Sequence, residues 1–228
     1  MKHPRLHVRD FGAQEYQIIW QRMQDFTRHR DEHSVDWLWL VEHPPVFTQG
    51  RAGKPEHVLA PGNIPIIKTD RGGQVTFHGP GQIVLYVLID IRRRKLGIKT
   101  VVAAIEQAVI KTLADLKIAA ELKTGAPGVY VQGRKIASLG LRVTQGCTYH
   151  GVSLNFNMDL EPFSRINPCG YQGLEVTQVS ELNPQAEQKE IEHKLCDYLA
   201  QELGYNDEQV VWPNNVSSNQ QPAETSSS

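Results

Sequence analysis

The feature that most constrains this chain is a glycine-rich segment that runs directly into a long apolar one. Residues 71–82 (RGGQVTFHGPGQ) hold four glycines in twelve positions, and glycine is expected where a backbone turns sharply or approaches a ligand closely. Residues 83–91 (IVLYVLIDI) are too continuously apolar for a half-exposed strand, which predicts a buried central strand. A polar, glycine-rich loop that leads into a buried strand indicates the floor of a binding site.

The size and the charge of the chain limit its class. With 228 residues, of which 40% are hydrophobic, it can bury a sizeable core as one domain. The 24 Lys and Arg residues nearly balance the 25 Asp and Glu residues, so no overall field favours a nucleic acid or a membrane surface as a partner, and we expect neither. The basic run at 92–95 fits either a solvated turn or a docking point for an acidic partner.

Localisation follows from the termini and the cysteines. No apolar stretch approaches the ~20 residues that span a bilayer. The first ten residues (MKHPRLHVRD) lack the apolar core of a signal peptide. Cys147, Cys169 and Cys196 form an odd set without CxxC spacing, which argues against a disulfide framework and a zinc knuckle. We expect a cytoplasmic protein with free thiols.

Residue periodicity predicts helices and strands in mixed order. Helices are expected over 12–30, from a Thr100 cap to about 116, and from 183 to 203. Strands are expected over 36–42, 83–91, 128–131, 135–143 and 147–158, with turns at Gln132-Gly133 and Gln145-Gly146. Because strands and helices do not alternate regularly, the fold class is α/β bordering on α+β, with a mixed sheet. Residues 1–212 form one domain, and the polar stretch 213–228 is expected to be a disordered tail.

Two residues have the chemistry of a catalytic pair. Cys169 lies in Asn-Pro-Cys-Gly, between a residue that fixes the backbone and one that opens access to it. Local sequence leaves open whether that placement is functional, although Cys147 and Cys196 fit packing better. Lys135 falls on the apolar face of a strand, where a lysine either extends to water or stays buried with a partner. A thiolate would be such a partner, and a close pair would make it the main form near neutral pH.

Metal and nucleotide chemistry find little support. The chain has no HExxH, and His43, His78 and His150 are isolated, so no metal site is expected. A Cys–His pair that uses His150 stays possible on composition, and His78 has the best claim to touch a substrate. Neither a Walker A loop nor a GxGxxG sequence opening a helix is present, so no nucleotide cofactor is expected. Val75 and Phe77 suggest a partly apolar ligand instead.

Several separated segments together resemble one known family. They are EHPPVFTQGR (42–51), RGGQVTFHGPGQ (71–82), GVYVQGRKIASLG (128–140), HGVSLN (150–155) and NPCG (167–170). In this order they resemble the lipoyl(octanoyl) transferases of lipoate biosynthesis, from about Glu15 to Leu182. The resemblance implies the fold shared with the catalytic domains of biotin and lipoate protein ligases, a mixed β-sheet flanked by helices.

The resemblance also implies an activity and the residues that carry it. An octanoyl group would pass from acyl carrier protein to a lysine of lipoyl domains, in 2-oxoacid dehydrogenase E2 subunits and the glycine cleavage H protein. No cofactor is implied, and we expect a monomer. By the match, Cys169 forms an acyl thioester, and Lys135 lowers its pKa and acts as acid and base. The residues matched to acyl binding are Arg71, Gly72, Gly73, Gln74, Val75, Thr76, Phe77, His78, Ser138, Leu139, Gly140, Gly151, Val152 and Ser153.

In this interpretation Val75, Phe77, Leu139 and Val152 wall an acyl pocket, and burying about six methylenes at ~0.8 kcal/mol each contributes roughly 5 kcal/mol. Three other functions stay open. An ATP-dependent ligase on the same scaffold would need no cysteine nucleophile, a cysteine hydrolase would need no acceptor protein, and an acyl-binding module would form no covalent adduct.

Overall fold

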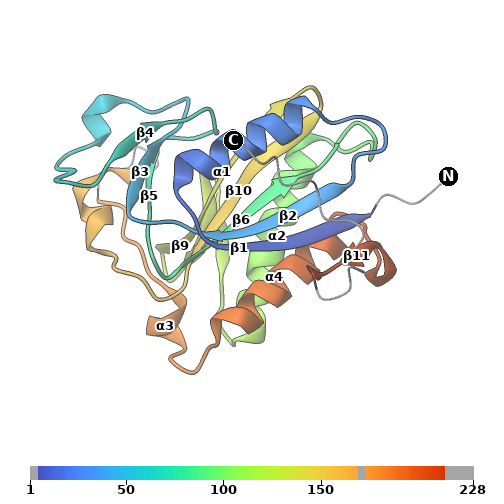
Figure 1. Ribbon diagram of the computed structural model, residues 1–228. Helices are drawn as coiled ribbons and strands as arrows, with labels where there is room; N and C mark the ends of the chain where they lie inside the picture. The colour runs from blue at the N-terminus through green and yellow to red at the C-terminus, as the bar shows by residue number, and fades with distance from the viewer. Residues whose placement is uncertain (1–4, 169–172, 214–228) are drawn as a thin grey trace.

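An eight-stranded mixed sheet forms the centre of the computed structural model, which describes residues 5–168 and 173–213 (Figure 1). Its strand order is β11-β1-β2-β6-β10-β9-β8-β7. β1 runs parallel to β2 and to β11, and the other neighbours are antiparallel. The strands are β1 (Leu6–Ala13), β2 (Asp36–Glu42), β6 (Gln82–Leu88), β7 (Glu121–Lys123), β8 (Ala126–Val131), β9 (Arg134–Thr144), β10 (Cys147–Asn155) and β11 (Val210–Val211). The predicted mixed sheet is confirmed, with the glycine-rich segment leading into its central strand β6.

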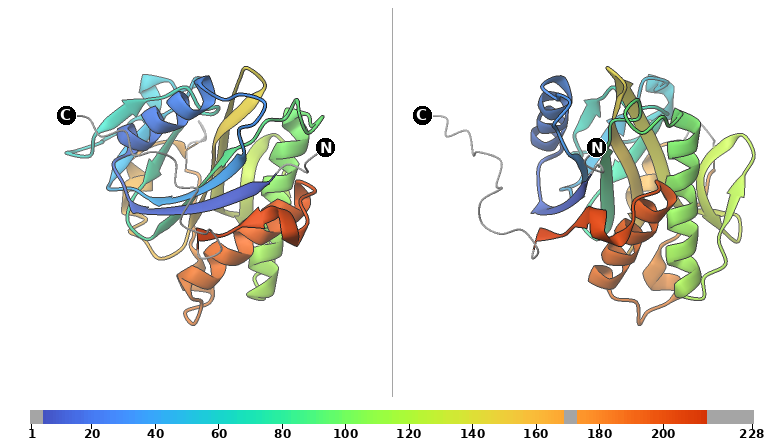
Figure 2. Two further views of the ribbon diagram at one scale, coloured as in Figure 1. Left: turned by 45° about the vertical axis from the view of Figure 1, so that its right-hand side comes forward. Right: turned by 90° about the vertical axis from the view of Figure 1, so that its right-hand side faces the viewer.

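Helices cover both faces of this sheet (Figure 2). α1 (Tyr16–Arg28) lies on one face, where Ile19 and Met23 pack against Trp39, Tyr86 and Leu88. α2 (Ile98–Asp115) and α4 (Gln188–Glu202) lie on the other face and bury the larger apolar core. α3 (Val179–Leu182) and three 3-10 helices (Pro55–His57, Glu161–Arg165 and Asp207–Gln209) are short.

A second, three-stranded sheet has the order β4-β3-β5. Its strands are β3 (Val46–Gln49), β4 (Ile66–Lys68) and β5 (Val75–His78). β5 lies inside the glycine-rich segment, which the sequence indicated to be a loop, so that part of the expectation was wrong. The strand forms because VTFH places two apolar side chains on one face. Val75 and Phe77 join a small core with Phe47 and Phe163.

The boundaries of several elements differ from the predicted ones. α2 begins at Ile98 after Gly97, so Thr100 lies inside the first turn and is not its cap. The last predicted helix, expected from 183, begins five residues later as α4, and α3 precedes the predicted range. The strands β1 and β11 were not expected. The two predicted hairpin turns are confirmed, because Gln132-Gly133 and Gln145-Gly146 all have positive φ, as a type I′ turn requires. The predicted tail lies outside the described residues from 214 onward.

Candidate active site

A cavity lies on the α1 side of the sheet, under the glycine-rich segment. It is lined by Tyr16, Arg71, Gly73, Gln74, Val75, Thr76, His78, Val84, Tyr86, Ser138, Leu139, Gly140, His150, Gly151, Val152 and Ser153. The structure therefore brings together all three sequence segments matched to acyl binding, which lie on β5 and the loop before it, on β9 and on β10. Two of the fourteen matched residues, Gly72 and Phe77, are not among those that line it.

Strand register explains why these segments meet. On neighbouring strands Ser138 pairs with Ser153 and Gly140 with Gly151, and Gly151 also pairs with Tyr86 of β6. A Cβ atom on Gly140 would come within 2.9 Å of the Gly72 carbonyl oxygen, so glycine at this position lets the loop cross the strand closely. The amide of Gly72 donates to the Leu141 carbonyl oxygen (3.0 Å). Gly72 thus fixes the loop on β9.

Phe77 and its neighbours follow the alternation of β5. The Phe77 ring lies 5.5 Å from that of Phe47 and 5.6 Å from that of Phe163, in the small core on the far side of the strand. Successive strand residues point to opposite faces, so the side chains that β5 presents to the cavity are Thr76 and His78. The wall of the cavity on this side is therefore more polar than the sequence suggested.

Arg71 holds the loop together from within. Its buried guanidinium donates to the Thr48 hydroxyl (2.9 and 3.1 Å) and to the carbonyl oxygens of Gly72 (2.9 Å) and Gln74 (2.8 Å). A buried charge needs such a set of acceptors, because an unpaired one is expensive. Arg71 therefore fixes the loop that forms one wall of the cavity.

Two buried histidines next to the cavity are neutral at physiological pH. Burial lowers the pKa of His43 to about 4 and, with the nearby charge of His43, that of His78 to about 3. The hydroxyl of Tyr86 donates to Nε2 of His43 (2.7 Å), whose Nδ1 donates to the Gln14 carbonyl oxygen (2.7 Å). Nδ1 of His78 donates to Oε1 of Gln82 (2.7 Å). These imidazoles act as fixed hydrogen-bonding groups.

Asp70 and His150 form a hydrogen-bond network that the sequence did not predict. Partial burial alone would raise the pKa of Asp70, but hydrogen bonds from His150 (2.9 Å), Tyr149 and Trp20 (2.9 Å) outweigh it and hold that pKa well below its usual range. Burial lowers the pKa of His150, and Asp70 offsets this in part. His150 has a φ of 61° within β10, a strained conformation of the kind found at functional sites. No sequence motif marks Asp70, which lies one residue before the matched segment.

Lys135 is buried, which settles the alternatives that the sequence left open. The residue is 2% exposed, and its Nζ donates to the Pro127 carbonyl oxygen (2.9 Å) and lies 5.3 Å from the centre of the Tyr130 ring. Gly128 makes room for it, because a Cβ atom there would come within 2.9 Å of Cε and 3.1 Å of Nζ.

Cys169 lies outside the described residues, and its two flanking segments are both anchored. On one side the amide of Asn167 donates to the His57 carbonyl oxygen (2.8 Å). On the other side the Lys135 amide donates to the Glu175 carbonyl oxygen (2.9 Å), and the Thr177 amide donates to the Lys135 carbonyl oxygen (3.0 Å). The segment that follows Cys169 therefore returns to Lys135, the residue that the sequence predicts to act together with Cys169.

Comparison with known proteins agrees with this geometry. The family described as the lipoyl protein ligase A/B catalytic domain matches residues 15–200. The chain belongs to this family. It is 59% identical over 197 residues to an octanoyltransferase of Xanthomonas campestris pv. campestris (strain B100), a match that covers 86% of this chain and 85% of the relative. The predicted family and the predicted acyltransferase class are thereby confirmed.

Solved structures of a lipoate protein ligase and a biotin protein ligase share the fold. A bi-partite lipoate protein ligase from Thermoplasma acidophilum superposes with a TM-score of 0.69 at 15% identity and covers 90% of this chain and 85% of its own. A biotin protein ligase from Aquifex aeolicus, in complex with biotin and ATP, gives a TM-score of 0.55 at 12% identity over 86% of this chain and 70% of its own. At these identities the likeness shows the fold alone, and it confirms the predicted ligase-like mixed sheet.

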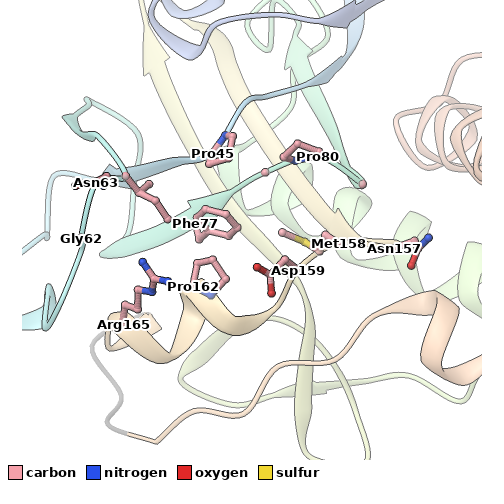
Figure 3. Close-up of a pocket in the computed structure, with 13 residues that line it drawn as sticks. Pro45, Gly62, Asn63, Phe77, Pro80, Asn157, Met158, Asp159, Pro162 and Arg165 are labelled. Atoms are coloured by element: carbon pink, nitrogen blue, oxygen red, sulfur yellow. The ribbon is translucent and has the colours of Figure 1, made fainter.

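A second cavity lies on the other side of β5 and contains no residue matched to acyl binding except Phe77. In Figure 3 the Phe77 ring lies near Pro162 and Met158, and Asp159 and Arg165 also line the cavity. The cavity is bounded by the loop 62–64 and by the 3-10 helix Glu161–Arg165. β5 thus lies between the two cavities, and the Phe77 side chain lines the second one.

The basic run at 92–95 is partly internal. Arg93 donates to the Ser34 carbonyl oxygen (2.7 Å) and pairs with the fully buried Asp36 (2.9 Å). The guanidinium of Arg94 lies 3.7 Å from the centre of the Tyr205 ring. Arg92, 67% exposed, and Lys95 remain at the surface. Two of the four cations therefore stabilise the fold.

The described residues contain neither a cluster of metal-binding side chains nor a helix that could span a membrane. Among residues 5–168 and 173–213, no group of three or more His, Cys, Asp or Glu side chains is arranged to hold a metal ion. None of the helices within the same ranges has the length and apolar character needed to cross a membrane.

Proposed function

We propose that this chain transfers an octanoyl group from the thioester of an acyl carrier protein to a lysine of a lipoyl domain, by way of a thioester on Cys169. The observation that carries the proposal is the buried Lys135, whose main chain is bonded to the segment that follows Cys169. The relative that shares 59% of the aligned residues is an octanoyltransferase. A cytoplasmic location and a monomeric state belong to the same proposal.

The reaction has two balanced steps. In the first, the Cys169 thiolate attacks the donor carbonyl, a new carbon–sulfur bond forms, and the carrier thiol leaves with a proton from Lys135. One thioester replaces another, so this step needs no ATP. In the second, the acceptor amine attacks the Cys169 thioester and a carbon–nitrogen bond forms. The carbon–sulfur bond to Cys169 breaks, Cys169 leaves as a thiolate, and Lys135 takes the proton that the amine loses. The product amide is more stable than the thioester, which drives the transfer forward.

The cavity supplies the binding site for the acyl chain. Val84 and the rings of Tyr16 and Tyr86 contribute apolar surface to its walls, and the glycines of β9 and β10 let a chain lie against backbone. The side chains of Val75, Leu139 and Val152, which the sequence placed in the wall, pack into the cores on the opposite faces of their strands. At ~0.8 kcal/mol for each methylene removed from water, six methylenes contribute about 5 kcal/mol of binding free energy. The neutral His78 adds no charge that would oppose an apolar chain.

Intact mass after incubation with octanoyl-carrier protein, without ATP, tests the proposal. The wild-type protein should gain one octanoyl group, Cys169→Ala should gain none, and Lys135→Ala should load much more slowly. Cys196→Ala is the matched control, since Cys196 is fully buried in α4 and should not affect loading. Adding a lipoyl domain should then move the octanoyl group to its lysine. An unmodified wild-type protein, or transfer that requires ATP, would contradict the mechanism.

A further inference from the structure

Tyr86 lies at the end of the cavity that is farther from Lys135. Lys135 is the second residue of β9, and Gly140 lies five residues further along the same strand. Gly140 pairs with Gly151, and Gly151 pairs with Tyr86. At ~3.3 Å per residue, five residues of strand cover ~17 Å. The cavity floor therefore extends from the neighbourhood of Lys135 toward the Tyr86 ring.

Packed side chains lie behind Tyr86 on this face of the sheet. Leu88, the next residue of β6 on the same face, is fully buried and packs with Ile19 and Met23 of α1. The Tyr16 ring, which also lines the cavity, lies over the neighbouring His43 with ring centres 5.2 Å apart. The Tyr86 and Tyr16 rings therefore both line this end of the cavity, in front of the packed residues of β6 and α1.

A buried hydrogen bond fixes the Tyr86 ring in this position. Tyr86 and His43 are 4% and 1% exposed, and the Tyr86 hydroxyl donates to Nε2 of His43 at 2.7 Å. Since the Nδ1 proton of His43 is given to the Gln14 carbonyl oxygen, Nε2 is free to accept. The polar end of the phenol is thus satisfied outside the cavity. Moving the ring would leave two buried polar groups unpaired, which proteins strongly avoid.

We propose that Tyr86, held by His43, sets the upper limit on the length of the acyl chain. This inference rests on the proposed function, because it places the thioester carbon at the Lys135 end. Seven carbon–carbon bonds, each advancing ~1.25 Å, make an extended octanoyl chain ~9 Å long. That length is shorter than the ~17 Å of β9 between Lys135 and Gly140, and the Lys135 side chain takes up part of the difference. A longer chain meets the Tyr86 ring.

Competition between donors of different length tests the limit. Octanoyl- and dodecanoyl-carrier protein are mixed with a lipoyl domain, and the ratio of the two products gives the ratio of their kcat/KM values. In Tyr86→Val the dodecanoyl share should rise by about tenfold or more, the size of effect that a few methylenes have in an apolar pocket. His43→Ala keeps the ring and removes its support, so a smaller rise in the same direction is expected.

Leu88→Ala is the matched control. It removes side-chain volume from the same strand and the same face, outside the cavity, so it should lower stability and leave the product ratio as in the wild type. A ratio that stays at the wild-type value in both Tyr86→Val and His43→Ala, with octanoyl transfer retained, would overturn the proposal. If Tyr86→Val does not fold, the product ratios of Tyr86→Leu and His43→Ala test the proposal in its place. Failure of the wild-type protein to transfer octanoyl would instead count against the proposed function.

Discussion

The main-chain amide of Lys135 donates a hydrogen bond to the carbonyl oxygen of Glu175, 2.9 Å away and six residues beyond Cys169 in the chain. The proposed acid–base group is therefore on the strand to which the chain returns after the proposed nucleophile. Burial of Lys135 adds a second constraint, because its side chain passes over Gly128 to reach the Pro127 carbonyl oxygen. The position of the ammonium group depends on a glycine that the reaction itself never uses.

Substitution of Gly128 should therefore impair catalysis. In Gly128→Ala the new Cβ would come within 2.7 Å of the Ala137 carbonyl oxygen and within 2.9 Å of Cε of Lys135, and the backbone there has a φ of 131°. We expect the rate of acyl transfer to fall about 10- to 100-fold, the effect of misplacing a reacting group by about 1 Å. The rate of octanoyl loading, followed by intact mass, measures it. In a protein that already carries Lys135→Ala, adding Gly128→Ala should lower the loading rate little further, because both changes act on the Lys135 side chain.

Gly125→Ala is the matched control for Gly128→Ala. Gly125 also has a positive φ, of 78°, but a Cβ atom there meets nothing within 4 Å. It should cost stability through backbone strain and leave the loading rate close to that of the wild type. Equal loss of rate in the two variants would show that Gly128 acts only through strain.

Asp70→Asn should destabilise the fold. The Asp70 carboxylate accepts hydrogen bonds from His150, Trp20 and Tyr149. An amide can accept fewer and turns a donor toward one of these partners, so the free energy of unfolding should fall by about 1–3 kcal/mol. Urea unfolding measures the change. Asp25→Asn is the control, because the Asp25 side chain is 63% exposed and forms a surface pair with Arg28 that should contribute little.

The sequence predicted the strands and the site segments best where the residue pattern is regular. β2 matches its predicted range of 36–42, and the two hairpin turns were recognisable because Gln-Gly provides two residues that accept positive φ. β5 was missed because four residues between glycines do not show a period. The edge strand β11 and its neighbour β1 depend on pairing with distant segments, which a local pattern cannot reveal.

The candidate site was predictable in part for the same reason. The family motifs supplied Lys135 and the residues of three cavity segments. The sequence did not indicate Tyr86 and Tyr16, which line the cavity, because an aromatic residue in a buried strand or helix looks like core. It did not indicate Asp70 either, because no motif marks that residue. Their roles come from register and hydrogen bonds between elements far apart in the chain. The orientation of Phe77 away from the cavity likewise depends on which face of β5 meets the main sheet.

Within the basic run, Arg93 and Arg92 should behave differently. Asp36 is fully buried and binds Arg93 (2.9 Å), Arg30, the Tyr205 hydroxyl (2.7 Å) and the Asp90 amide (2.8 Å). Arg93→Ala leaves this carboxylate with one cation fewer, so the free energy of unfolding should fall by about 1–3 kcal/mol. Arg92→Ala, at an exposed side chain, should leave it nearly unchanged. Equal effects in urea unfolding would contradict the assignment.

The same distinction permits a clean test of docking. Arg92→Glu together with Lys95→Glu reverses charge at the surface and spares the Asp36 cluster. If the run docks an acidic carrier protein, KM for the carrier should rise and its salt dependence should weaken. An unchanged KM assigns Arg92 and Lys95 to a solvated turn.

Acid should destabilise the protein through its buried histidines. Burial lowers the pKa of His43 to about 4 and that of His78 to about 3 in the folded state, below the ~6.5 of an unfolded chain. As pH falls below 6.5, the unfolded chain takes up protons that the folded protein does not, so the free energy of unfolding should fall by about 1.4 kcal/mol per pH unit for each histidine. The stability that comes from keeping His43 neutral is fully present above pH 6.5 and is lost progressively as the pH falls to about 4. Urea unfolding between pH 6 and 4.5 gives the slope of the free energy of unfolding against pH, which reports the number of protons taken up on unfolding. In His43→Gln that number should be smaller by about one. His33→Gln, at a side chain 86% exposed, should keep the wild-type slope, and a wild-type slope in His43→Gln would show that His43 is not held neutral.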